Sequence, residues 1–365
     1  MSGLIDCDVH FSVPSLQDLL PYLDPASRDL VQHSSDFGLT LPTYPWQHPT
    51  GWTRKDTFSA DTLPGTSLRL LREQLLDRYD VRYGILTPEE LMCVSVLPNL
   101  HLAAALASAH NDWMIDHLLE QDKRLRGSLL VAAHHPESAA REIRRLGGRD
   151  DIVQVILPGG SRIPYGNPFY DPLWRAAHEM GLAVAIHVYY EGMGIAAAPV
   201  TAAGMPDFYC EYHALLCAAN MGHLASILYH GILERFPGQR VVLVESGVTW
   251  VAGFLWRLDQ DWRSCRSETP WCRRPPSEYV WEGVRFTTQP LEEPNDMELL
   301  RGALAGMHPA ETLMFASDYP HWDFDEPTLT LRTLPKEWRD NVAFANARQL
   351  YGLPAAESAG VGAPA

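Results

Sequence analysis

The stretch Leu4-Ile5-Asp6-Cys7-Asp8-Val9-His10 sets the interpretation of the whole chain. It is a short, mostly apolar run, typical of a buried β-strand, and it ends in an Asp-x-His pair. Because side chains alternate along a strand, Asp8 and His10 point to the same side and can reach one ligand. Such a pair near the start of a chain is as often a turn or a cap, so the rest of the sequence must decide between the two.

Seven further stretches resemble the first. Most are nearly continuous apolar runs, as expected of parallel strands that are buried on both faces. The eight predicted strands are residues 4–9, 83–87, 125–132, 153–157, 183–188, 240–245, 284–287 and 312–317.

Helical patterns alternate with these strands. The predicted helices are residues 67–79, 100–121, 136–146, 171–180, 211–236, 250–263, 294–305 and 337–351. Repeated strand-then-helix order indicates right-handed crossovers and a parallel sheet. Eight such units favour an α/β fold closed into a (β/α)8 TIM barrel, with an open doubly wound sheet as the alternative.

Three stretches are too long and too rich in Pro and Trp to be simple connections: residues 33–66, 189–210 and 267–282. The first two follow strands one and five, so we expect long insertions over the carboxyl-terminal mouth of the barrel, where loops commonly recognise substrates. We interpret residues 1–353 as a single barrel domain. The Ala/Gly/Pro-rich residues 354–365 are predicted to be a disordered tail.

Composition excludes several classes of partner. The chain has 365 residues, 46% of them hydrophobic, and a net charge of −16, which argues against nucleic acid and anionic membranes. No apolar run approaches the roughly 20 residues that span a bilayer, and the N-terminus lacks the pattern of a signal peptide. The six cysteines form no C-x-x-C pair, so we expect reduced thiols and a cytoplasmic protein.

Metal-binding residue types recur at the ends of other predicted strands. His187 ends strand five, Glu245 ends strand six and Asp318 follows strand eight. Imidazole and carboxylate groups suit Zn²⁺, Mn²⁺ or Fe²⁺, and a barrel brings its strand ends together. Each residue also has an ordinary explanation, since His187 could be a core histidine and Asp318 a helix cap. Their shared position favours a metal site.

The sequence as a whole resembles a known family. It is similar to the amidohydrolase-related proteins that include aminocarboxymuconate-semialdehyde, resorcylate and carboxyvanillate decarboxylases. The resemblance runs through nearly the whole chain, in Ile5-Asp6-Cys7-Asp8-Val9-His10, Gly231-Ile232-Leu233-Glu234-Arg235-Phe236-Pro237, Arg240-Val241-Val242-Leu243-Val244-Glu245-Ser246-Gly247, Phe315-Ala316-Ser317-Asp318-Tyr319-Pro320-His321 and Asn346-Ala347-Arg348-Gln349-Leu350-Tyr351.

The resemblance implies one divalent metal ion, Zn²⁺ first and Mn²⁺ or Fe²⁺ as alternatives, held by Asp8, His10, His187 and Asp318. We expect Asp318, Glu245 and His187 to be the catalytic residues. Two departures stand out. The first member of the strand-one pair is usually His or Glu in this family, and here it is Asp8. Strand six usually carries a histidine, and here it carries Glu245, which could bind the metal, act as an acid or base, or orient a neighbour.

Five further residues are candidate substrate contacts: Arg257, His321, Trp46, Arg54 and His213. Arginine pairs with carboxylates and aromatic rings stack on flat ligands, so this set fits a carboxylated aromatic substrate. The alternatives are a structural turn for His321, a structural bond to Asp259 and neighbouring loops for Arg257, and a subunit interface for the loop that carries Trp46 and Arg54.

The resemblance thus implies a metal-dependent carboxy-lyase that removes CO2 from an aromatic or unsaturated acid without oxidation. The alternative is a hydrolase that uses metal-activated water on a C–N, C–O or C–C bond. A third hypothesis is a barrel that binds without catalysing, which the complete set of metal-binding residues disfavours. The resemblance also implies a homo-oligomer, with a homodimer as the common form.

Overall fold

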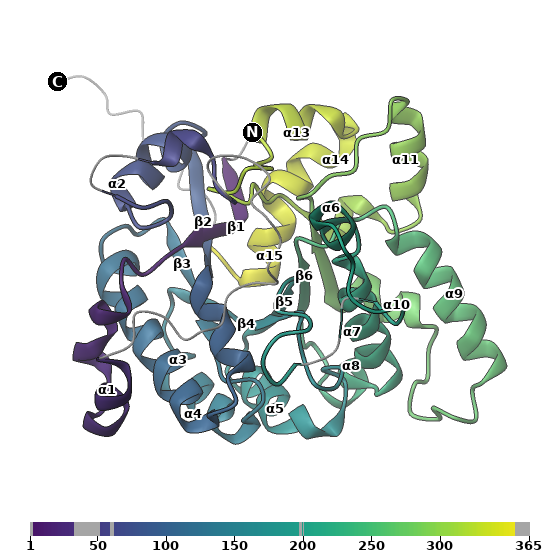
Figure 1. The fold of residues 1–365 in the computed structure, drawn as a ribbon. Coiled ribbons are helices and arrows are strands. Elements are labelled where there is room, and N and C mark those ends of the chain that lie inside the picture. Colours follow the sequence, from purple (N-terminus) through teal and green to yellow (C-terminus); the bar gives the residue numbers. More distant parts are fainter. Residues whose placement is uncertain (1–2, 33–51, 59–61, 197–198, 200, 355–365) are drawn as a thin grey trace.

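A computed structural model describes residues 3–32, 52–58, 62–196, 199 and 201–354. Eight parallel strands follow one another around a single sheet in chain order (Figure 1). Their bounds are β1 Leu4–Phe11, β2 Val81–Pro88, β3 Leu125–Leu130, β4 Ile152–Pro158, β5 Ala183–His187, β6 Val241–Val244, β7 Val284–Thr287 and β8 Leu313–Met314. The (β/α)8 barrel and all eight predicted strands are confirmed.

The barrel closes between its first strand and the segment that follows β8. Cys7 N donates a hydrogen bond to Phe315 O at 2.9 Å, and His10 N donates to Tyr319 O at 2.7 Å. Between them, Asp318 N donates to Asp8 O at 3.2 Å. β8 itself is short, but this pairing continues its course and places Asp318 beside Asp8.

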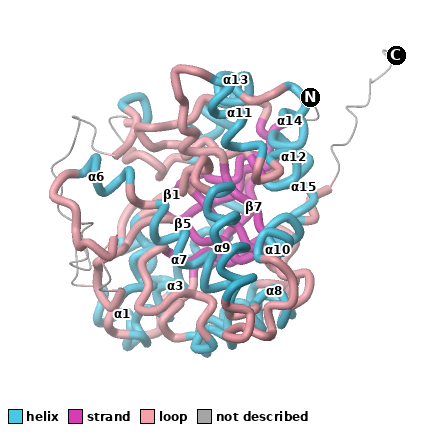
Figure 2. The backbone as a smooth tube through the Cα atoms, turned by 90° about the vertical axis from the view of Figure 1, so that its right-hand side faces the viewer, coloured by secondary structure: helices cyan, strands magenta, loops and turns pink. Residues whose placement is uncertain are grey.

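Helices surround the strands, which lie at the centre of the molecule (Figure 2). They are α1 Pro25–Val31, α2 Leu68–Leu71, α3 Leu100–Met114, α4 Pro136–Leu146, α5 Asp171–Glu179, α6 Tyr209–Ala214, α7 Cys217–Tyr229, α8 Ile232–Arg235, α9 Val251–Ser264, α10 Pro276–Gly283, α11 Met297–Ala305, α12 Pro309–Thr312, α13 Pro327–Thr333, α14 Lys336–Asp340 and α15 Asn346–Tyr351. Short 3-10 segments occupy Leu16–Tyr22, Lys55–Thr57, Glu90–Val96 and Pro168–Tyr170, and π-helical turns occupy Arg72–Leu76, Ile115–Leu119 and Asn341–Ala345.

Helix α4 illustrates how local sequence forms these elements. His135 Nδ1 accepts a hydrogen bond from Ser138 N at 3.2 Å, and Pro136 occupies the first turn, where its missing N–H is not needed. Ala139, Ala140, Ile143 and Leu146 form its buried stripe, with the spacing of one helical face.

The single helix predicted over residues 211–236 is wrong, because this stretch forms α6, α7 and α8. A turn at Leu215 and Leu216 separates α6 from α7, and Gly231 adopts a left-handed conformation with φ of +67° between α7 and α8. Apolar periodicity continues across both breaks, so it did not reveal them.

The long stretches differ in position. Tyr189 and Tyr190, from the stretch after β5, lie at the mouth, and so does Trp52 from the stretch after β1. Residues 267–282 do not lie over the mouth, because they end in α10, which leads directly into the start of β7. Residues 33–51, part of the first predicted insertion, and residues 355–365 of the predicted tail lie outside the described residues.

None of the six cysteines is paired in a disulfide, as predicted. None of the helices in the described ranges combines the length and apolar character that a bilayer-spanning segment needs.

Replacing Gly231 with alanine should lower the free energy of unfolding by about 1–2 kcal/mol, because an L-residue is strained in the left-handed region. The new Cβ would also lie 2.8 Å from Cδ1 of Trp271. Denaturant titration would measure the change. Gly253→Ala, in the middle of α9 with no atom near its new Cβ, is the control and should be neutral or slightly stabilising. Equal stability of the two variants would contradict the left-handed conformation assigned to Gly231.

Candidate functional site

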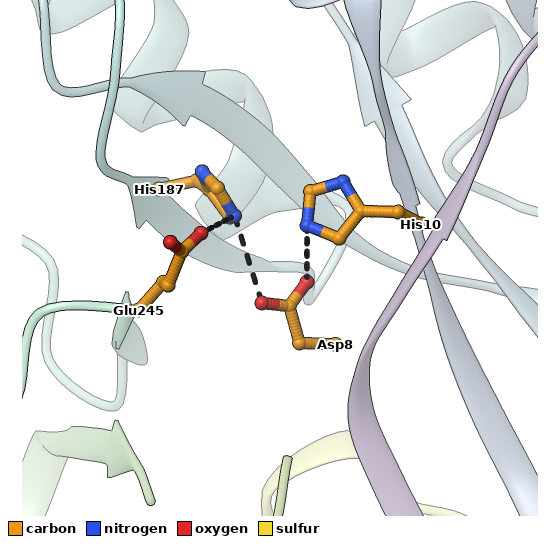
Figure 3. Close-up of side chains that lie close together, drawn as sticks. All are labelled: Asp8, His10, His187 and Glu245. Atoms are coloured by element: carbon orange, nitrogen blue, oxygen red, sulfur yellow. Dashed lines mark ion pairs between the residues drawn. The ribbon is translucent and has the colours of Figure 1, made fainter. Parts of the chain in front are cut away.

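Four side chains from three strand ends converge at the mouth of the barrel (Figure 3). One ligand atom from each of Asp8, His10, His187 and Glu245 lies within 4.8 Å of the others, and all four residues are buried. His187 Nε2 lies 3.0 Å from Glu245 Oε2 and 3.5 Å from Asp8 Oδ2. The strand ends named from the sequence therefore meet, as a closed barrel requires.

Asp318 joins this group through His10. Its Oδ1 lies 3.1 Å from His10 Nε2 and 2.7 Å from His321 Nδ1, while its Oδ2 accepts a hydrogen bond from Gln289 at 3.2 Å. A second set of donor atoms within 4.8 Å of one another consists of His10, Glu245, Asp318 and His321. Asp318 thus lies beside the cluster of Figure 3, and its own group shares His10 and Glu245 with that cluster.

Several inward-facing atoms of the cluster lack a hydrogen-bond partner in the described part of the chain. They are Asp8 Oδ2, His10 Nε2, His187 Nε2 and Glu245 Oε2, all of them buried. Leaving a buried polar atom without a partner costs free energy. These four atoms face one another without hydrogen-bond geometry, so a cation between them would accept their lone pairs. These donors fit a divalent cation.

The outer nitrogen of each histidine lies beside an oxygen atom. His187 Nδ1 lies 2.9 Å from Val188 O, and His10 Nδ1 forms an ion pair with Glu89 Oε2 at 2.7 Å that lacks hydrogen-bond geometry. An acceptor at Nδ1 keeps the proton there and leaves the Nε2 lone pair free, which is the usual arrangement of a metal-binding histidine. Both Nε2 atoms face Asp8.

Asp6 and Thr87 hold Asp8 in place. Thr87 Oγ1 donates to Asp8 Oδ1 at 2.5 Å. Asp6 Oδ1 accepts from Asp8 N at 3.3 Å and from Ser317 N at 3.0 Å, so it ties β1 to the segment before Asp318. Burial raises the pKa of Asp6 to about 7.

Charge interactions in the cluster are strong because it is buried. Burial and the nearby charge of Asp318 raise the pKa of Glu245 to about 7. Burial alone would lower the pKa of His187, but the negative charges of Asp8 and Glu245 beside it hold it well above its usual value. The surroundings of both groups are negative, and negative surroundings favour any cation.

Backbone strain is concentrated at the same mouth. Glu245 and Asp318 have φ of +53° and +59°, and Tyr189 and Tyr190, just after β5, have +87° and +68°. Non-glycine residues rarely adopt this conformation, and it persists where surrounding contacts enforce it, commonly at functional sites. Here it turns two carboxylates towards the strand-end histidines.

The pocket beside the cluster is small, with a cavity volume of about 30 Å³. His321 lies in its wall, in the position predicted from the sequence. The lining residues are His10, Trp52, Pro88, Glu89, Met92, His187, Tyr189, Tyr190, His321, Trp322 and Asp323. This lining is aromatic and acidic, and contains no Lys or Arg among the described residues.

The two arginines predicted as substrate contacts lie outside this pocket. Arg257 is 68% exposed on α9 and forms an ion pair with Asp261, whereas Asp259, the partner expected in the structural alternative, accepts hydrogen bonds from Ser277. Arg54 pairs with Asp56 at 2.6 Å and stacks on Phe324. Trp46 lies outside the described residues.

The ring of His213, from α6, lies near the carboxylates of Glu245 and Asp323. Its Nε2 lies 3.4 Å from Asp323 Oδ2, and donor atoms of His213, Glu245 and Asp323 form a third group within 4.8 Å. The predicted proximity of His213 to the mouth is therefore observed.

Two residues of the site were not identified from the sequence. Glu89 follows β2 and contacts both His10 Nδ1 and His321 Nε2, the latter at 3.0 Å. Gln289 follows β7 and is fully buried beside Asp318. Both lie within two residues of a strand's carboxyl end, so the rule that found His187 and Asp318 would have found them if it had been applied to strands two and seven.

Comparison with known proteins gives a consistent result. The sequence profile of the family described as Amidohydrolase matches residues 5–353. A gamma-resorcylate decarboxylase from Rhodococcus jostii strain RHA1 is 24% identical over an alignment of 327 residues that covers 80% of this chain and 90% of that protein.

Two solved structures share the fold. An amidohydrolase from Mycobacterium avium subsp. paratuberculosis K-10 aligns with a TM-score of 0.71 and 20% identity, over 96% of this chain and 99% of that one. A dihydroxybenzoic acid decarboxylase from Polaromonas sp. JS666, with bound manganese and 2-nitroresorcinol, aligns with a TM-score of 0.64 and 17% identity, over 97% and 98%.

Proposed function

Because this chain belongs to the amidohydrolase family over residues 5–353, we propose that it is a metal-dependent enzyme that removes CO2 from an aromatic carboxylic acid without oxidation. One observation carries the metal part of the proposal: unpaired donor atoms of Asp8, His10 and His187 face one another at the barrel mouth. Asp318 is the proposed fourth protein ligand. The donor set suits Zn²⁺, Mn²⁺ or Fe²⁺.

The choice of decarboxylation rests on the similarity to gamma-resorcylate decarboxylase, together with the residues that line the pocket. The rings of Trp52, Tyr189 and Trp322 line it, and aromatic walls of this kind suit a flat ring by stacking. A bound divalent ion would offset negative charge on the oxygen atoms of the substrate.

The protein must also deliver a proton to the ring carbon. Protonation there allows the carbon–carbon bond to break, so that CO2 leaves and a hydrogen atom takes its place. Glu245 and Asp318 are the candidate donors. Asp318 has a route to the pocket, because His321 lies in the pocket wall with its Nδ1 2.7 Å from Asp318 Oδ1.

The reaction can be tested with gamma-resorcylate and related aromatic acids, labelled with ¹³C in the carboxyl group, in D2O. We expect ¹³CO2 and one deuterium atom on the ring carbon that carried the carboxylate, followed by mass spectrometry and NMR. In a parallel reaction in H2¹⁸O, incorporation of ¹⁸O into an organic product without release of CO2 would identify a hydrolase instead.

His187→Ala should remove the divalent ion and the turnover together, with metal binding weakened more than about 100-fold, because a ligand is lost rather than a supporting residue. Metal content would be measured by inductively coupled plasma mass spectrometry. The control is His178→Ala, which removes an exposed histidine from α5 and should leave both values unchanged. Full metal content in a folded His187→Ala protein would contradict the proposed site.

Glu89→Gln should weaken metal binding by about 10- to 100-fold, because the carboxylate at His10 Nδ1 raises the basicity of the ring. Competition with a chromophoric chelator would measure the affinity directly. Glu137→Gln, an exposed carboxylate in the first turn of α4, serves as the matched control. An unchanged affinity in Glu89→Gln would show that Glu89 does not support His10.

A further inference from the structure

A second cavity lies between the segments that follow β4 and β5 and the helix α7. Its volume is about 450 Å³, within the range of about 300–1,000 Å³ that is usual for small-molecule sites. The described lining includes residues 159–164, Glu191 and part of the first half of α7. None of these residues lines the pocket beside His10 and His187, so the two cavities are separate.

Glu191 is the one acidic residue in the described lining of this cavity, and one of its oxygen atoms is unpaired. The residue is 3% exposed. Its Oε2 accepts a hydrogen bond from the hydroxyl group of Tyr212 at 3.4 Å, whereas its Oε1 is buried without a hydrogen-bond partner in the described chain. Burial raises the pKa of Glu191 to about 7. A buried carboxylate without a partner costs free energy, and a cationic group beside it would offset that cost.

Two glycines make room for this carboxylate. A Cβ at Gly159 would overlap Oε1 of Glu191, and a Cβ at Gly160 would overlap the carbonyl oxygen of Tyr190. Gly160 N also donates a hydrogen bond to Tyr189 O at 2.9 Å. The segments after β4 and β5 are therefore in direct backbone contact, and this contact fixes Glu191 in the wall of the cavity.

His223, from α7, supports the same wall as a neutral ring. Its Nδ1 accepts a hydrogen bond from Tyr165 N at 3.3 Å, which places the ring proton on Nε2, and Nε2 donates to Gly159 O at 2.8 Å. Burial lowers the pKa of His223 to about 4, which also favours the neutral ring. Both ring nitrogen atoms are used, so the imidazole contributes no charge to the cavity.

Arg162 supplies a charge of the opposite sign. It is an exposed residue of the same lining, and it forms no ion pair or hydrogen bond with any residue in the described ranges. Small or apolar residues make up much of the remaining lining, among them Ile163, Pro164, Ala218 and Ala219. The cavity thus combines one carboxylate, one guanidinium group and an apolar surface.

We propose that this cavity binds a small aliphatic amino acid, with its ammonium group at Glu191 and its carboxylate at Arg162. The two charges of such a zwitterion match the two charged groups of the lining, and arginine pairs well with carboxylates. A ligand with a single charge would leave either Glu191 or Arg162 unmatched. The site lies outside the metal cluster, and binding there does not require the reaction proposed above.

The test is the binding of leucine to the full-length protein, measured by isothermal titration calorimetry beside two matched probes. Isopentylamine is leucine without its carboxylate, and 4-methylpentanoate is leucine without its ammonium group. We expect one leucine to bind per chain, and each probe to bind at least about 10-fold more weakly, because each lacks one charged contact.

Two variants identify the contacts. Glu191→Gln should weaken leucine binding at least about 10-fold, but its affinity for 4-methylpentanoate should not fall, because that probe has no ammonium group. Arg162→Ala should weaken leucine binding to a similar extent, but its affinity for isopentylamine should not fall. Arg175→Ala, which removes an exposed arginine from α5, is the control and should bind leucine as the unaltered protein does.

Absence of leucine binding to the unaltered protein at millimolar concentrations would overturn the proposal, and so would equal affinities for leucine and either probe. Unchanged leucine affinity in either folded variant would also overturn it. Arg162 is exposed, so Arg162→Ala keeps this test decisive if Glu191→Gln fails to fold. Leucine binding that is lost in His187→Ala but kept in Glu191→Gln would place the ligand at the metal cluster instead.

Discussion

The pairing of β1 with the segment after β8 is the constraint on which the site depends. It closes the barrel and brings Asp318 N within 3.2 Å of Asp8 O, although the two residues lie 310 positions apart in the chain. Asp6 strengthens the same junction by accepting hydrogen bonds from Asp8 N and Ser317 N. Without this junction the carboxylates of Asp8 and Asp318 would not share one histidine.

Bringing these carboxylates together opposes ordinary electrostatics. Buried like charges repel, and removing each from water costs several kcal/mol unless an opposite charge compensates. The barrel holds them by rigid strands and by enforced backbone conformations at Glu245 and Asp318. A site that is built in this way gains most from a cation, which agrees with the unpaired atoms at its centre.

Much of the fold could be predicted because buried parallel strands leave a continuous apolar signal. The same logic located Asp8, His10, His187, Glu245 and Asp318, since strand ends in a barrel must meet. The long helix over residues 211–236 was predicted wrongly because apolar spacing does not report a left-handed glycine such as Gly231.

The two arginines were the least predictable of the candidate site residues. Arg54 and Arg257 were chosen for charge complementarity to a carboxylate, but each is satisfied by a nearby aspartate, which the sequence alone did not show. Glu89 and Gln289 were missed although they follow strands. A contact such as Glu89 with His321, 232 residues apart, depends on the closed barrel and cannot be derived from local spacing.

The central claim is that donors from distant strands share a cation. An anomalous-scattering map from crystals grown with Mn²⁺ tests it most directly. The account predicts a peak about 2.0–2.3 Å from Asp8, His10 and His187, with the Nδ1 atoms of the two rings still facing Glu89 and Val188. A map with no peak among these residues, or rings turned so that Nε2 points away, would contradict it.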